Sequence, residues 1–289
     1  MTAQSTRASA LDLSLLRFLR ARVPVGAALN DALPPRRAEL APPALAAELL
    51  RALRTAPRDR DVPARLDGLL AQLHCLDLDR LVVPQQRLAF WLNCYNALML
   101  DAVRRFGLRA SVRERPGFYR LAAYRIGGER FSAEEIEHGI LRGNRAPHPR
   151  LPPLFALEDP RRRHSLVACD PRIHFVLNCA TRSCPPLRVY EAADLEEQLD
   201  RATAGFLNGG GVEWDASERT AILSSLFAYY AEDFGAPEAL AGFIERYLER
   251  PQPAAAIGAA VAAGCVRYRT HDWSLPGMDD VTEKGSDAG

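Results

Sequence analysis

The chain has 289 residues, of which 48% are hydrophobic and 25% charged, a composition typical of a soluble globular protein with a full hydrophobic core. The formal net charge of +1 gives no general attraction to nucleic acid or to an anionic membrane, so neither is expected as a partner. No apolar run approaches the ~18 residues that a membrane-spanning helix needs, and membrane insertion is not expected.

The cysteines suggest a reducing compartment. They are scattered without a CxxC pair, and a chain of this length needs no disulfides for stability, so free thiols are expected. The first 24 residues lack the pattern of a secretory leader and are expected to form a short amphipathic helix. These features predict a cytoplasmic protein. The six cysteines are Cys75, Cys94, Cys169, Cys179, Cys184 and Cys265.

Helices dominate the first part of the chain. Residues 45–53 and 65–73 carry apolar side chains at helical spacing. Residues 85–106 give the strongest helix prediction, with Pro84 at the start and Gly107 at the end. Because that run is apolar nearly all round, we expect a buried central helix.

A hairpin is expected next, over residues 124–132, with Gly127-Gly128 as its turn. Ser132 and Glu135 form a capping-box pattern that opens a short helix over residues 133–142. Residues 143–163 contain five prolines, and they predict a long surface loop that could cover a site.

The second half mixes strands and helices. Two short strands joined by Asp170-Pro171 are expected within residues 161–180. A helix (194–208), a second hairpin (212–224), helices over 226–234 and 238–248, an Ala-rich helix and a last strand follow. The sequence therefore predicts an α+β fold, mostly helical with a small antiparallel sheet. We expect a helical lead-in (1–80) packed on a main domain (81–277) and a disordered tail (278–289).

Two sets of polar side chains lie on predicted helices. Asn93 and Asn96 share one face of the central helix, where they either bond neighbouring loops or line a polar cavity. Glu134, His138 and Arg142 follow one another at intervals of four. That stripe is either a solvated face with weak ion pairs or a general base with a carboxylate and an anion-binding arginine beside it.

The stretch HFVLNCATRSCPP, residues 174–186, is the strongest candidate for chemistry. In an extended strand His174 and Cys179 point to opposite faces, which disfavours a dyad between them and leaves His138 as the available base. A reactive thiolate needs a nearby cation or imidazolium. Cys179 could instead be a small buried hydrophobe, a redox partner of Cys184, or a zinc ligand.

Five motifs carry a resemblance to a known family. LAFWLNCYNAL, IEHGILR, DPRIHFVLNCATRSCPPLRVY, FAYYAEDFG and HDWSLP, which together span residues 80–276, resemble the domain-of-unknown-function family 547 (DUF547), in a bacterial-type member. The family has no defined activity, so the resemblance implies the domain and not the reaction. Its signature positions here are Trp91, Asn93, Tyr95, Asn96, Glu137, His138, Arg142, Asp170, Arg172, His174, Cys179, Pro185, Asp272 and Trp273.

The resemblance also ranks the cysteines and exposes two departures. Plant-type members carry serine at the position of Cys184, which favours Cys179 as the thiol with a role. His271 and Pro276 stand where the family usually has tyrosine and asparagine. A role for that hydroxyl or amide is therefore in doubt in this chain.

These residues suggest a cysteine-dependent hydrolase or acyltransferase acting on an amide, ester or thioester of a small molecule or peptide, without a cofactor. Cys179 is expected to attack the carbonyl and His138 to take its proton. The alternatives are a non-enzymatic scaffold with a buried polar network, and a metal site built from His138, His174 and Cys179. The expected catalytic residues are Cys179, His138, Glu137, His174 and Asp170. The expected substrate-binding residues are Asn93, Asn96, Tyr95, Arg142, Arg172 and Cys184.

Overall fold

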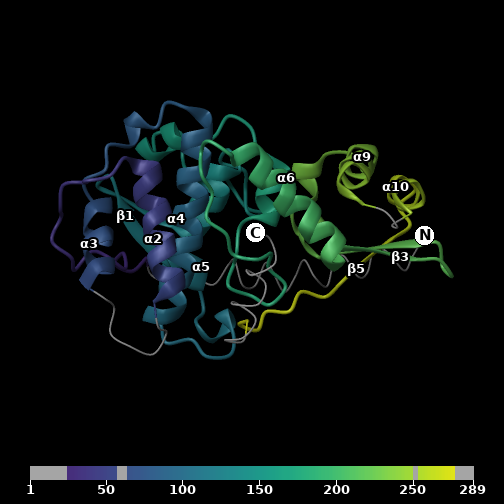
Figure 1. Ribbon diagram of the computed structural model, residues 1–289, viewed down its shortest axis with the longest axis horizontal. Helices are drawn as coiled ribbons and strands as arrows, with labels where there is room; N and C mark the ends of the chain where they lie inside the picture. Colours follow the sequence, from purple (N-terminus) through teal and green to yellow (C-terminus); the bar gives the residue numbers. More distant parts are fainter. Residues whose placement is uncertain (1–24, 57–63, 250–252, 277–289) are drawn as a thin grey trace. The chain divides into compact units, whose positions relative to one another are not determined.

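The computed structural model describes residues 25–56, 64–249 and 253–276 (Figure 1). It divides into two compact units, Met1–Ala168 and Cys169–Gly289. The boundary expected near residue 80 falls inside the first unit, and that division stays a prediction. The expected N-terminal helix and the polar tail from residue 278 lie outside the described residues.

The first unit is built around one buried helix. Helix α4 (Pro84–Arg105) confirms the strongest sequence prediction, with proline in its first turn and two arginines in its last. Helix α2 (Pro42–Thr55) packs along α4, and α3 (Ala64–Leu73) packs against α2 (Figure 1). Trp91 and Tyr95 of α4 are almost completely buried, as an all-round apolar helix requires.

A confirmed hairpin lies beside these helices. Strands β1 (Ala123–Ile126) and β2 (Glu129–Ser132) pair antiparallel, with Ile126 opposite Glu129. Gly127 and Gly128 both have positive φ, 57° and 83°, which the tight turn between right-twisted strands demands. The buried Asn30 amide donates to the carbonyls of Leu70 and Arg125, both at 3.1 Å, and so ties the hairpin to α3.

The segment after β2 is helical as predicted, but its turns are wider than those of an α-helix. Residues Glu135–Leu141 form a π-helix, in which the Arg142 N–H donates to the Glu137 carbonyl at 2.9 Å. The predicted capping box is present: Ser132 N–H donates to Glu135 at 2.8 Å, and Glu135 N–H donates to the Ser132 hydroxyl at 3.2 Å. A Cβ on Gly139 would lie 2.5 Å from the Phe155 ring, so only glycine allows this close approach.

The two strands expected within residues 161–180 are absent from the described structure, and that prediction is wrong. Residues Pro160–His164 and Pro171–Phe175 form 3₁₀ turns instead. Each begins at the proline of an Asp-Pro pair. The aspartate accepts the N–H of the arginine two residues on, at 3.0 Å for Asp159 and 2.9 Å for Asp170. This side-chain cap and the fixed φ of proline favour a turn over a strand, so the strand-face argument for His174 and Cys179 fails.

The second unit contains a mixed sheet. Strands β3 (Val212–Asp215) and β4 (Thr220–Leu223) form the predicted antiparallel hairpin, and β5 (Val266–Tyr268) pairs with β4 in parallel. The helices are α6 (Leu195–Phe206), α7 (Leu226–Tyr229), α8 (Ala231–Phe234), α9 (Pro237–Tyr247) and α10 (Ala254–Ala262). The single helix expected over 226–234 is broken at Tyr230, which separates α7 from α8.

Aromatic side chains form the centre of that unit. The Phe175 ring, 1% exposed, lies 5.2 Å from the Phe206 ring and 5.5 Å from the Phe227 ring, measured between centroids. It also lies 5.9 Å from Phe243 of α9. The turn that carries Phe175 is thereby fixed against three helices.

The α+β class is confirmed, with mostly helical structure and small sheets. Among the described residues, no helix has both the length and the apolar character needed to cross a membrane.

A buried carboxyl in the first unit predicts a pH-dependent stability. Burial raises the pKa of Glu134 from 4.5 to about 7, although Arg120 lies 3.6 Å away. The folded chain therefore binds this proton more tightly than the unfolded chain. The resulting stabilisation is full below pH 4.5 and is lost as the pH rises to 7. Its size is about 3 kcal/mol, at ~1.4 kcal/mol for each pKa unit.

Glu134→Gln is expected to remove this dependence between pH 4.5 and 7, and urea unfolding at both ends of the range measures it. Glu158→Gln, at an exposed position, is the matched control and is expected to follow the parent chain. An unchanged pH profile in Glu134→Gln would contradict the assignment.

The aromatic core predicts a large effect of one substitution. Phe175→Ala is expected to lower the free energy of unfolding of the second unit by about 3–5 kcal/mol, because it removes a buried ring from a packed cluster. Near-ultraviolet circular dichroism during urea unfolding measures this loss. Val167→Ala, at a fully exposed side chain, is expected to change stability by less than about 0.5 kcal/mol. Equal effects of the two changes would argue against the central place of Phe175.

Candidate functional site

A buried histidine–aspartate pair lies at the start of the second unit. His174 sits on the Pro171–Phe175 turn, and its Nε2 lies 2.8 Å from Oδ2 of Asp233 in α8. The side chains are 1% and 0% exposed. The imidazole also stacks on the Tyr230 ring, with centroids 3.8 Å apart and planes 12° apart. Both the hydrogen bond and the stacking fix the orientation of the imidazole.

Cys169 lies close to this pair, and the three side chains form one group. Its sulfur, a ring nitrogen of His174 and a carboxylate oxygen of Asp233 all lie within 4.8 Å of one another. Cys169 is partly exposed, whereas His174 is buried. A thiol, an imidazole and a carboxylate in this order are the groups that thiol nucleophiles use in catalysis.

The same three groups are also zinc-ligand types. With metal–ligand bonds of about 2.1 Å, a tetrahedral site needs about 3.4 Å between the imidazole nitrogen and the carboxylate oxygen. The observed 2.8 Å separation is that of a hydrogen bond. A metal ion would therefore have to displace the shared proton and spread the pair.

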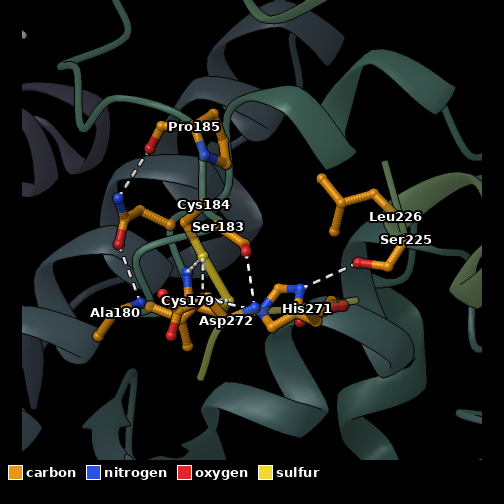
Figure 2. Close-up of a disulfide and its surroundings, with 12 residues drawn as sticks. Cys179, Ala180, Ser183, Cys184, Pro185, Ser225, Leu226, His271 and Asp272 are labelled. Carbon is orange, nitrogen blue, oxygen red and sulfur yellow. Dashed lines mark hydrogen bonds between the residues drawn. A yellow bond between two sulfur atoms is a disulfide. The ribbon is translucent and has the colours of Figure 1, made fainter. Parts of the chain in front are cut away.

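Cys179 and Cys184 form a disulfide (Figure 2). This corrects the expectation that every cysteine is a free thiol, because the short loop between them brings their Cα atoms to 6.3 Å. Asn178 braces the loop: its amide donates to the Pro185 carbonyl at 2.8 Å, and its side-chain oxygen accepts the Ala180 N–H at 2.9 Å. Ala180 has a positive φ of 60°, a conformation that costs about 1–2 kcal/mol in a non-glycine residue.

A chain of polar contacts leads away from the disulfide. The Thr181 hydroxyl lies 3.1 Å from Cys184 Sγ and 3.4 Å from Cys179 Sγ. The same oxygen lies 2.8 Å from Nε2 of His271, whose Nδ1 lies 3.2 Å from the Ser225 hydroxyl (Figure 2). Thr181, His271 and Ser225 are all buried, so this relay of hydrogen bonds operates away from bulk water.

The disulfide loop is held by the last described segment. Arg182 N–H donates to the Ser274 carbonyl at 2.8 Å, and Asp272 N–H donates to the Ser183 hydroxyl at 2.8 Å. Trp273 packs against His271, with ring centroids 4.5 Å apart. The HDWS motif thus supplies the histidine of the relay and fastens it to the loop.

The first unit holds a separate polar cluster on α4 and the π-helix. The Tyr95 hydroxyl donates to Glu137 at 2.9 Å, and the Arg142 guanidinium donates to Nδ1 of His138 at 2.7 Å. Nε2 of His138 lies 3.8 Å from the Glu137 carboxylate. Because Nδ1 accepts from arginine, the neutral ring carries its hydrogen on Nε2. Glu134, expected on the same stripe, pairs with Arg120 instead.

The other residues predicted for the site include two buried amides on α4 and the ion-paired Arg172. Asn93 and Asn96 are fully buried on α4. Arg172 pairs with Asp170, Glu196 and Asp200, with nitrogen–oxygen distances of 2.6, 2.7 and 2.8 Å. These carboxylates raise the pKa of Arg172 although burial opposes them. Asp170 thus contacts Arg172, and the carboxylate beside His174 is that of Asp233.

The sequence did not predict several residues of the Cys169–His174–Asp233 group or of the hydrogen-bond relay beside the disulfide. Cys169 immediately precedes the Asp170-Pro171 pair. Because the residues around it were predicted to form a strand, nothing in the sequence set it apart as a site residue. Asp233 lies in the motif FAYYAEDFG, whose sequence alone assigns it no role. His271 marked a departure from the family pattern. No pattern in the sequence indicated Thr181 or Ser225, which depend on contacts across about 90 and 46 residues.

One comparison with known proteins gives a match. Residues 79–207 match the family model described as "Protein of unknown function, DUF547". No curated protein matches the chain, and no solved structure does. The matched segment includes His138, Cys169, His174 and both disulfide cysteines. That the chain is a bacterial-type member stays a prediction. Over residues 79–207 the chain is therefore similar to the DUF547 family.

Proposed function

We propose that the chain is a cysteine-dependent hydrolase or acyltransferase, and that Cys169, His174 and Asp233 carry the reaction. The observation behind this is the grouping of thiol, imidazole and carboxylate within 4.8 Å. The substrate class is an amide, ester or thioester of a small molecule or peptide. Cys169, unlike Cys179, is not held in a disulfide.

Each group has a defined role in this reaction. Cys169 Sγ attacks the carbonyl carbon, and the thiol proton passes to His174. Asp233 holds the imidazole in place and stabilises the imidazolium that forms. The imidazolium then protonates the leaving amine, alcohol or thiol, and the acyl group remains on Cys169. Water completes hydrolysis, or another acceptor completes acyl transfer.

Burial explains why Asp233 matters to this proposal. An imidazolium in a site with little water costs several kcal/mol unless a counter-charge accompanies it. Asp233, with its side chain 0% exposed and 2.8 Å from the ring, supplies that charge. Tyr230 prevents the ring from rotating out of the pair.

The nucleophile first expected, Cys179, enters this proposal only for the reduced chain, because its sulfur is bonded to Cys184. His138 lies in the first unit and is held by Arg142. The proposal therefore uses the histidine of the cysteine's own unit. Roles for His138, Glu137, Asn93, Asn96 and Arg142 in the reaction stay predictions.

A zinc site at the same three residues is the second candidate, because sulfur, nitrogen and oxygen donors are grouped there. Zinc would protect Cys169 from alkylation, and a chelator would restore its reactivity. Under the thiol proposal, zinc at micromolar concentration leaves the alkylation rate of Cys169 unchanged.

Thiol reactivity tests the proposal within one chain. At pH 6.5 and without reductant, Cys169 is expected to react with iodoacetamide about ten-fold faster than Cys75 and Cys265, because a neighbouring imidazole favours the thiolate. Those two cysteines are exposed free thiols and serve as internal controls. Peptide mass spectrometry of timed samples gives the three rates.

The variants Asp233→Asn and His174→Ala are expected to bring the rate of Cys169 down to that of Cys75. Circular dichroism identifies any variant that does not fold, and the more conservative Asp233→Asn then decides. If Cys169 reacts no faster than the exposed thiols in the parent chain, the triad is not activated and the scaffold interpretation is favoured.

A further inference from the structure

We propose that the Cys179–Cys184 disulfide is a second chemical site, which exchanges electrons with a dithiol. This goes beyond the proposed acyl chemistry and does not rest on it, because it involves neither Cys169 nor His174. The inference depends on the different surroundings of the two sulfurs and on the relay whose hydroxyl lies nearer to one of them (Figure 2).

The two sulfurs are not equivalent. Cys184 is 8% exposed, and its sulfur accepts the Cys179 N–H at 3.1 Å and lies 3.1 Å from the Thr181 hydroxyl. Cys179 is partly exposed, and its sulfur lies farther from that hydroxyl, at 3.4 Å. We therefore assign Cys179, the more exposed residue, as the one that an incoming thiolate attacks, and Cys184, which has two donors at its sulfur, as the leaving thiolate.

Each hydrogen bond of the relay has a direction under this proposal. A disulfide sulfur carries no hydrogen, so in the contact with Cys184 Sγ the Thr181 hydroxyl is the group that can donate. We assign the tautomer of His271 that permits this donation: Nε2–H donates to the Thr181 oxygen, and Nδ1 accepts from the Ser225 hydroxyl. His271 is therefore a positioning residue: its N–H occupies the threonine oxygen and leaves the threonine hydrogen aimed at the sulfur.

The reaction balances with a dithiol as reductant. One thiolate of the dithiol attacks Cys179 Sγ, the sulfur–sulfur bond breaks, and its electron pair leaves with Cys184 Sγ. The second thiol of the reductant attacks the mixed disulfide and releases Cys179. Two electrons reach the protein, and the two thiol protons of the reductant end on Cys179 and Cys184. The products are a protein dithiol and an oxidised reductant.

The rate of reduction by dithiothreitol at pH 7 tests this site. Thr181→Val, which keeps the shape of the side chain but lacks the hydroxyl, is expected to slow reduction about ten-fold, the effect of one hydrogen bond to a charged group. Thr203→Val is the matched control: it is the same change at another buried threonine of the second unit, whose hydroxyl donates to the Leu199 carbonyl at 2.8 Å. It is expected to leave the rate within about two-fold of the parent chain.

His271→Gln, alone and combined with Thr181→Val, tests whether His271 acts through the Thr181 hydroxyl, which a purely structural role would not require. It is expected to slow reduction in the parent background but to have no further effect in Thr181→Val, because His271 acts through that hydroxyl. Additive losses in the double variant, or an unchanged rate in Thr181→Val, would overturn the proposal. So would a disulfide that dithiothreitol reduces only after the chain is unfolded in urea.

Single-cysteine variants show which sulfur is attacked, even if a threonine variant fails to fold. In Cys184→Ser the Cys179 thiol is expected to form a mixed disulfide with glutathione disulfide at least about ten-fold faster than the Cys184 thiol does in Cys179→Ser. Faster capture at Cys184 would contradict the assigned polarity. Because Cys169 is replaced by serine in both chains, the result does not depend on the proposed acyl chemistry.

Discussion

The buried hydrogen bond between His174 and Asp233 is the interaction on which the second unit depends. A carboxyl group whose side chain has no exposed surface needs hydrogen-bond partners in place of water. At 2.8 Å, the imidazole supplies such a partner and ties the Pro171–Phe175 turn to α8. Phe175, one residue on, is then directed into the aromatic core, so the polar pair and the hydrophobic centre are fixed together. A paired imidazole beside a partly exposed cysteine is also what thiol chemistry requires.

The chain thus contains two kinds of cysteine site in one unit. Cys169 lies outside the disulfide, beside a histidine–aspartate pair, whereas Cys179 and Cys184 are bonded and lie within 3.4 Å of a threonine hydroxyl. The first arrangement suits attack on a carbonyl, and the second suits transfer of electrons. The disulfide also bears on the cytoplasmic location, which stays a prediction, because disulfides in that compartment are usually transient and catalytic or redox-sensing.

Much of the fold could be predicted because local signals and packing agree. Pro84, the all-round apolar run and the closing arginines define α4, and Gly127-Gly128 defines the first hairpin. The failure at residues 161–180 has a specific cause. The repeated Asp-Pro-Arg pattern, at Asp159 and Asp170, forms side-chain caps with the arginine two residues on. The short apolar runs beside these caps favoured the prediction of strands instead. Of the candidate site, His174 could be found, but Asp233 and His271 join their clusters only through tertiary contacts.

One measurement tests the central claim most directly: the position of the acetyl group after brief reaction of the folded, oxidised chain with p-nitrophenyl acetate at pH 7. Peptide mass spectrometry locates the label among Cys75, Cys169 and Cys265, which lie outside the disulfide and are at least partly exposed. The account predicts acetylation of Cys169 first, with loss of that preference in Asp233→Asn. Labelling in order of exposure, with Cys75 and Cys265 ahead of Cys169, would contradict it.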